Sequence, residues 1–107
     1  MVAGGVAFAL QCDGGTCYGT EAGEVIEGTD TDETIIAFGG NDKISGYGGG
    51  DVIDGGEGND NISGAGGDDD LHGGPGDDYF DGGEGYDKCF GEVGNDSGFV
   101  GCEEVID

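Results

Sequence analysis

The segment Gly55-Gly56-Glu57-Gly58-Asn59-Asp60-Asn61-Ile62-Ser63 decides the fold, because its nine-residue pattern recurs along most of the chain. A second clear copy reads Gly73-Gly74-Pro75-Gly76-Asp77-Asp78-Tyr79-Phe80-Asp81. In both copies glycine fills three of the first four positions, aspartate the sixth and a large apolar residue the eighth. A fixed period of this kind predicts a repeat architecture, in which each unit packs against its neighbours.

Three series of residues follow this period in phase. Glycine holds the fourth position of seven consecutive units, at Gly40, Gly49, Gly58, Gly67, Gly76, Gly85 and Gly94. An unbroken series of aspartates holds the sixth position, at Asp42, Asp51, Asp60, Asp69, Asp78, Asp87 and Asp96. Apolar residues hold the eighth position, at Ile44, Ile53, Ile62, Leu71, Phe80 and Cys89, and this series ends at Gly98. Chance does not keep three interleaved series in phase over such a distance.

The same register continues towards the N-terminus in a weaker form. Two further steps of nine residues give Ile35 and Ile26 in the apolar position, with Glu33 and Glu24 in the acidic one. The repeats therefore extend over residues 19–99, with degenerate ends.

The repeat predicts an all-β fold, a parallel β-roll (β-solenoid) with two nonapeptides per coil. Each unit divides into a glycine-rich turn of six residues and a three-residue strand whose middle side chain faces inwards. Two units complete one coil, and coils stack at about 4.8 Å, the ordinary separation of strands. The repeats then form about 4–5 coils. A Cys-bearing cap is expected on each side, at residues 10–18 and 100–107.

The composition argues that this fold needs a cation. The chain has 107 residues, of which 29 are glycine and 34% are hydrophobic, so the thin core does not offset the entropy lost on folding. Acidic residues outnumber basic ones by 25 to 2, giving a formal net charge of −23. A metal-free chain of this kind is expected to be disordered. The charge also excludes nucleic acid and anionic membranes as partners.

The pattern matches G-G-x-G-x-D-x-U-x, where U is a large apolar residue, and the chain resembles the RTX family of haemolysin-type calcium-binding repeats over about three quarters of its length. The resemblance is highly specific for a calcium-binding module and much less specific for a biological role. In the family, each ion lies between one turn and the turn two units later.

Calcium suits such turns because it takes 6–8 oxygen ligands from carboxylates and backbone carbonyls. The aspartate carboxylates and the carbonyls of the fourth-position glycines are the expected ligands. Turns on each edge of the roll stack their aspartates in a column, which gives the pairs Asp42/Asp60, Asp60/Asp78, Asp78/Asp96, Asp51/Asp69 and Asp69/Asp87. About five ions are expected, within a range of three to seven.

Two further pairs at the N-terminal side, Glu24/Asp42 and Glu33/Asp51, would raise the number to seven. Glutamate is one methylene longer than aspartate, and Ala22 and Thr31 replace the glycine of the turn. These units are therefore expected to act as a metal-free cap instead.

Four cysteines, two near each end of the chain, suit disulfides in an oxidising compartment. The Cα atoms of disulfide partners lie within about 7 Å, whereas Cys12 and Cys102 are separated by four to five coils. The expected bridges are therefore Cys12–Cys17 and Cys89–Cys102. The apolar residues 1–9 are interpreted as the end of a signal peptide, with an N-terminal strand that caps the fold as the alternative.

Other interpretations of these motifs fit less well. An EF-hand at Asp68-Asp69-Asp70 would place His72 at a ligand position and lacks flanking helices. A phosphate-binding glycine loop needs a following helix N-terminus and a surface that does not repel phosphate. The cysteine spacings are poor for zinc, and an array of threonines for binding ice is missing.

The sequence thus predicts a calcium-binding module that is secreted or lies at the cell surface. It is expected to act as a structural or interaction module and to have no catalytic activity. One histidine and two basic residues provide no nucleophile–base constellation. The alternative is a stabilising or export-assisting repeat domain of a larger secreted protein. Calcium ions are the partners that the sequence identifies; it identifies no protein or glycan partner, and a monomer is expected.

Overall fold

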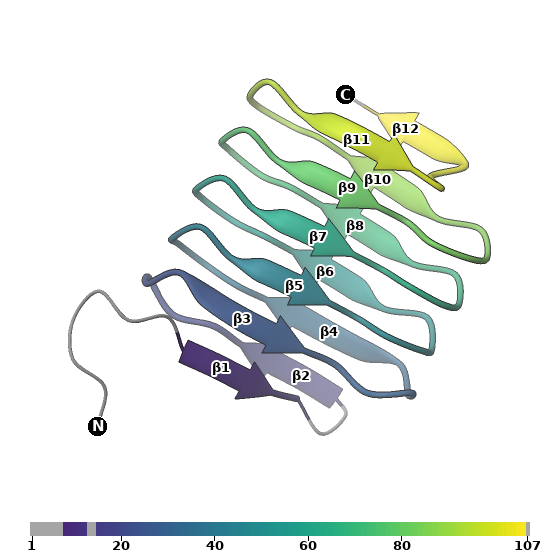
Figure 1. The fold of residues 1–107 in the computed structure, drawn as a ribbon, viewed down its shortest axis with the longest axis horizontal. Coiled ribbons are helices and arrows are strands. Elements are labelled where there is room, and N and C mark those ends of the chain that lie inside the picture. The colour runs from purple at the N-terminus through teal and green to yellow at the C-terminus, as the bar shows by residue number, and fades with distance from the viewer. Residues whose placement is uncertain (1–7, 13–14, 107) are drawn as a thin grey trace.

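The computed structural model describes residues 8–12 and 15–106, and within these residues it is built from parallel strands without a helix. Twelve strands form two sheets of six (Figure 1). One sheet contains β1 (Phe8–Gln11), β3 (Glu24–Glu27), β5 (Lys43–Ser45), β7 (Asn61–Ser63), β9 (Tyr79–Asp81) and β11 (Ser97–Val100). The other contains β2 (Gly15–Tyr18), β4 (Glu33–Ile36), β6 (Val52–Asp54), β8 (Asp70–His72), β10 (Lys88–Phe90) and β12 (Glu104–Ile106).

The chain alternates between the two sheets, so that each coil contributes one strand to each (Figure 1). Strands pair with a shift of two repeat units: Ile44 of β5 lies beside Ile62 of β7, and Ile53 of β6 beside Leu71 of β8. The all-β, parallel β-roll with two nonapeptides per coil is therefore confirmed, with about five coils.

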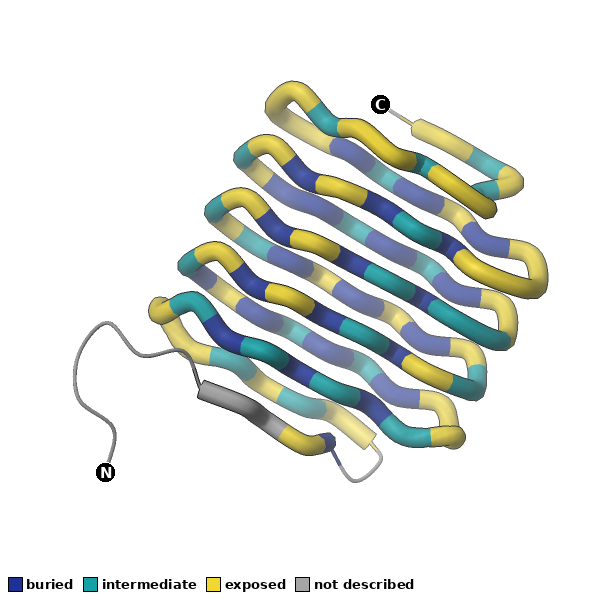
Figure 2. The backbone as a smooth tube through the Cα atoms, viewed as in Figure 1, coloured by how far each residue is buried: buried dark blue, intermediate teal, exposed yellow. Residues whose placement is uncertain are grey.

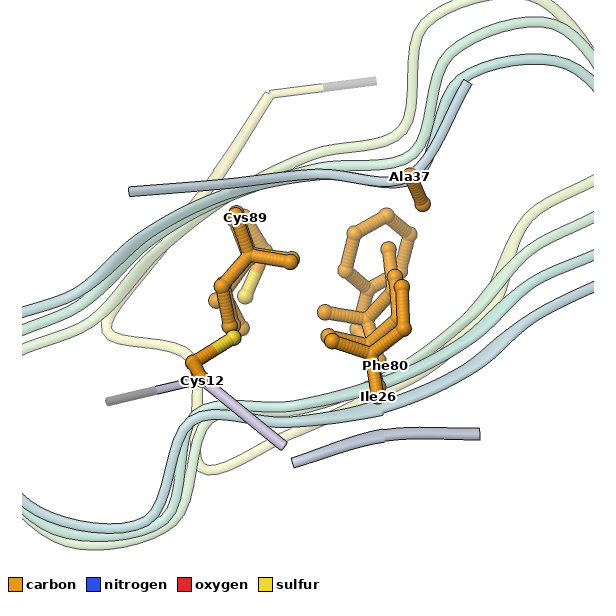
Figure 3. Packing of buried hydrophobic residues seen from close by; sticks show 10 residues of the cluster. Cys12, Ile26, Ala37, Phe80 and Cys89 are labelled. Atoms are coloured by element: carbon orange, nitrogen blue, oxygen red, sulfur yellow. The ribbon is translucent and has the colours of Figure 1, made fainter. Parts of the chain in front are cut away.

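The core is the seam between the two sheets. The eighth-position side chains of both sheets face each other there, and Figure 3 shows the two opposing files. These side chains are fully or almost fully buried: Ile26, Ile35, Ile44, Ile53, Ile62, Leu71, Phe80 and Cys89. Neighbours along each strand are more exposed, which gives the alternation of buried and exposed segments in Figure 2. This follows from the two-residue period of a strand.

Both ends of the roll depart from the regular shift of eighteen residues. Leu10 of β1 pairs with Ile26 of β3, and Lys88 of β10 pairs with Glu104 of β12. The coil at each end is therefore two residues shorter than an internal coil. At β11 the register shifts between Ser97 and Val100, and the ring of Phe99 stacks on Phe80 at 5.0 Å between ring centroids. The core is thereby covered at its C-terminal end, where an open sheet edge would otherwise expose it.

Two disulfides staple these ends, Cys12–Cys17 and Cys89–Cys102, and the predicted pairing is confirmed. The strand β1 begins within residues 1–9, interpreted above as the end of a signal peptide, and continues into the expected cap at residues 10–18, so the alternative of an N-terminal strand fits Phe8–Gln11. Residues 1–7 lie outside the described part of the chain, and the signal-peptide interpretation stays a prediction. In the described residues, no helix is long and apolar enough to cross a membrane.

Candidate calcium-binding turns

The sixth-position aspartates form two columns of buried carboxylates, one along each edge of the roll. The six from Asp42 to Asp87 have at most 3% of their surface exposed. Each aspartate accepts a hydrogen bond at Oδ1 from the backbone N–H of the acidic residue eighteen positions earlier, at 2.8 Å. The side chain of one coil is thereby held against the turn of the coil before it. The sequence-predicted aspartates are brought together in the pairs that the repeat implies.

The second carboxylate oxygen of every one of these aspartates lacks a hydrogen-bond partner within the part of the chain that the structure describes. Among the described residues, buried oxygens without a hydrogen-bond partner include Oδ2 of Asp42, Asp51, Asp60, Asp69, Asp78, Asp87 and Asp96. A buried carboxylate oxygen without a partner costs free energy, and seven in a regular series are not an accident of packing. A hard cation that binds oxygen fits this series, because one ion can contact oxygens from successive coils.

Backbone carbonyls of the fourth-position glycines supply a second set of oxygens. These glycines all have positive φ, for example 106° at Gly58 and 121° at Gly76, a conformation that glycine adopts without strain. The carbonyl oxygen of Gly40 lies so close to Gly58 that a Cβ at Gly58 would overlap it. Within the described residues, no hydrogen bond is accepted by the carbonyl oxygens of Gly40, Gly49, Gly58, Gly67, Gly76, Gly85 or Gly94.

The electrostatics of the columns favour a bound cation. Burial, reinforced by the neighbouring acidic side chains, raises the pKa of Asp60 and of Asp69 to about 8 from an ordinary 3.8. Burial also raises the pKa of Asp51 and Asp78 to about 7 and of Asp42 to about 6. Without a metal ion, the column cannot be fully ionised at neutral pH except at a cost in stability. A divalent cation removes that cost.

The two N-terminal glutamates differ from the aspartates in how their carboxylates are satisfied. Glu24 and Glu33 are buried in the acidic position, with 2% and 3% of their surface exposed. The backbone N–H and the hydroxyl of Thr20 donate to Glu24, and the same groups of Thr29 donate to Glu33. The longer glutamate side chain therefore turns back onto its own loop. In the described part of the chain, neither carboxylate has an unpartnered buried oxygen, which supports the expected metal-free cap.

A further polar ladder was not predicted from the sequence. The side-chain oxygen at the fifth position accepts a hydrogen bond from the backbone N–H eighteen residues later, at 2.7–2.9 Å. The acceptors are Asp32, Asn41, Asn59, Asp68 and Asp77. This ladder runs in the opposite direction to the aspartate ladder and satisfies turn amides without a metal ion. The recurrence of asparagine or aspartate before the sixth position was the available signal.

Among the described residues, no group of three or more carboxylate, histidine or cysteine side chains has a geometry suited to a metal ion. The arrangement of the turns explains this, because each candidate site would use two carboxylates from successive coils and take its remaining oxygens from the backbone.

The fold and these turns define a class of protein: a parallel β-roll with stacked, acidic, glycine-rich turns. A family model for the RTX calcium-binding nonapeptide repeat matches residues 18–53, 27–62 and 63–97. The chain therefore belongs to the RTX calcium-binding repeat family, whose members are generally structural rather than catalytic and are typically secreted. Neither a curated protein nor a solved structure matches the chain.

Proposed function

We propose that this protein is an extracellular calcium-binding β-roll whose folding depends on Ca²⁺, and that it acts as a monomeric structural or interaction module without catalysis. The observation that carries the proposal is the regular series of buried aspartate Oδ2 atoms that lack a partner. Membership of the RTX repeat family supports calcium as the ion.

The ligands of each ion are two aspartate carboxylates from successive coils and the carbonyls of the glycines in the same turns. Five such pairs exist: Asp42/Asp60, Asp60/Asp78, Asp78/Asp96, Asp51/Asp69 and Asp69/Asp87. Glu24 and Glu33 are not ligands, because their own threonines already satisfy their carboxylates. Five repeat-encoded ions follow.

Calcium dependence of folding follows from charge and core size. The chain carries a formal net charge of −23 and its core is a single seam of side chains. Ions bound between coils remove repulsion and cross-link turns that the apolar seam alone does not hold. Calcium in the cytosol is too dilute to fold such a chain, whereas extracellular calcium suffices. The two disulfides support the same compartment.

Native mass spectrometry of the oxidised chain in calcium buffers tests this proposal. The expected result is a folded monomer that carries at least five calcium ions, with a narrow charge-state distribution. The same chain in chelator is expected to give the broad distribution of an unfolded protein. A compact monomer without bound calcium in both buffers would refute the proposed function.

A further inference from the structure

Glu103 occupies the aspartate position of the repeat at the C-terminal end of the roll. Lys88 of β10 pairs with Glu104 of β12, which aligns the preceding residues, Asp87 and Glu103. A step of eighteen residues from Asp87 reaches Val105 instead, and Val105 lies beside Cys89 in the apolar position. Because the last coil is two residues shorter, Glu103 does not fall on the nine-residue period, and the period alone does not identify it.

Glu103 makes the same hydrogen bond to the preceding coil that the sixth-position aspartates make in the regular repeats. Its Oε1 accepts a hydrogen bond from the backbone N–H of Asp87 at 2.8 Å, the same length as at every regular step of the columns. In return, the backbone N–H of Glu103 donates to the carbonyl oxygen of Asp87 at 2.9 Å. Glu103 is thus held against Asp87 by both its side chain and its backbone.

Asp87 has one carboxylate oxygen that no hydrogen bond satisfies among the described residues. The residue is fully buried, and this oxygen is Oδ2. The last loop also packs closely on the turn before it. A Cβ at Gly82 would lie 2.8 Å from the carbonyl oxygen of Gly101, and one at Gly101 would lie 2.8 Å from the carbonyl oxygen of Gly83.

The adjacent disulfide fixes the residue before Glu103. Cys102 is bonded to Cys89 of β10, with 6.0 Å between the two Cα atoms. The loop that carries Glu103 is therefore tied to the core strand that follows Asp87 in the chain. A ligand held in this way loses little freedom when an ion binds.

We propose that Asp87 and Glu103 bind an additional calcium ion at the C-terminal end of the roll, beyond the five sites that the nonapeptides supply. This inference rests on the proposed function. Glu103 is exposed, so the end site is open to water. We expect its half-saturation at a calcium concentration several-fold higher than that of the internal sites.

Ion counts by native mass spectrometry, for the parent and two variants, test the inference. Glu103→Gln keeps an oxygen that accepts the hydrogen bond from Asp87 but removes the charge. Glu104→Gln removes the same charge one residue later, at a side chain that accepts a hydrogen bond from Tyr86 at 2.8 Å. At saturating calcium we expect six ions in the parent and in Glu104→Gln, and five in Glu103→Gln, all with the same circular dichroism spectrum.

Each alternative outcome is distinct. Five ions in both the parent and Glu103→Gln would overturn the end site and leave the proposed function intact. A parent without calcium would refute both. Loss of the fold in Glu103→Gln at saturating calcium would also overturn the inference, because the five internal sites should still hold the roll together.

Discussion

Asp60 Oδ1 accepts a hydrogen bond of 2.8 Å from the backbone N–H of Asp42, while Asp60 Oδ2 has no hydrogen-bond partner among residues 8–12 and 15–106. One carboxylate therefore has two separate tasks. The first oxygen joins two coils through the backbone and needs no metal ion. The second oxygen is buried where only a cation or a proton can satisfy it.

Replacement of Asp60 by asparagine separates these tasks. Asp60→Asn retains an oxygen for the hydrogen bond to Asp42 and loses the second, anionic oxygen. Because Asp60 belongs to two of the proposed sites, the calcium concentration at half-saturation is expected to rise several-fold. The bound-ion count is expected to fall in native mass spectrometry. A calcium titration followed by circular dichroism measures the midpoint.

The matched control is Asp54→Asn. Asp54 is exposed, and its Oδ1 accepts a hydrogen bond from the backbone N–H of Gly56 at 3.0 Å, which an asparagine also accepts. The change in charge is the same, but no proposed ligand is lost. The midpoint and the ion count are expected to stay at the parent values. Equal effects of the two substitutions would show that the aspartate columns are not ligand columns.

Acid is predicted to stabilise the metal-free fold. Burial raises the pKa values of five column aspartates to about 6–8 in the metal-free fold, from 3.8: Asp42, Asp51, Asp60, Asp69 and Asp78. A group with a raised pKa contributes stability that is present below its unfolded pKa and lost as pH rises through its folded pKa. In chelator, stability is therefore expected to be greatest near pH 4 and to decline as pH rises to about 8, so the β signal in circular dichroism falls over that range.

The double variant Asp60→Asn, Asp69→Asn provides the control for this pH dependence. It replaces the two groups whose pKa values are about 8 with neutral amides. The fall of the β signal in chelator is expected to begin at higher pH than in the parent. A β signal that instead grows from pH 5 to pH 8 in chelator would contradict the electrostatic account.

Magnesium is predicted not to replace calcium. Mg²⁺ requires near-octahedral coordination at about 2.0–2.1 Å and gives up its water reluctantly, whereas Ca²⁺ accepts the 6–8 oxygens of a flexible turn. At equal millimolar concentration, Mg²⁺ is expected to leave the chain largely unfolded by circular dichroism. If Mg²⁺ folds the chain as well as Ca²⁺ does, simple neutralisation of charge drives folding and the ligand scheme is wrong.

The regular part of the fold was predictable because one period encodes both the strand and the turn. The inward side chains, from Ile26 to Cys89, occupy the predicted seam, and the strands pair at the predicted shift of two units. The disulfide pairing followed from distance alone, because the two ends of the roll are too far apart to be bridged.

The ends of the fold were not predictable from the period. There the loops are two residues shorter, so that β1 and β12 join the sheets out of the nine-residue register. The same shortening concealed Glu103, whose structural position is that of an aspartate eighteen residues after Asp87. The role of Thr20 and Thr29 as internal partners of the buried glutamates also depends on side-chain geometry that the repeat does not encode.

A calcium titration of the chelator-treated, oxidised chain, followed by far-ultraviolet circular dichroism at pH 7.5, tests the central claim most directly. The account predicts a disordered spectrum in chelator and a cooperative rise in β signal with a midpoint at about 10⁻⁴–10⁻³ M Ca²⁺. Cooperativity is expected because neighbouring ions share aspartates such as Asp60 and Asp69. A full β spectrum at neutral pH in excess chelator, unchanged by added calcium, would contradict it.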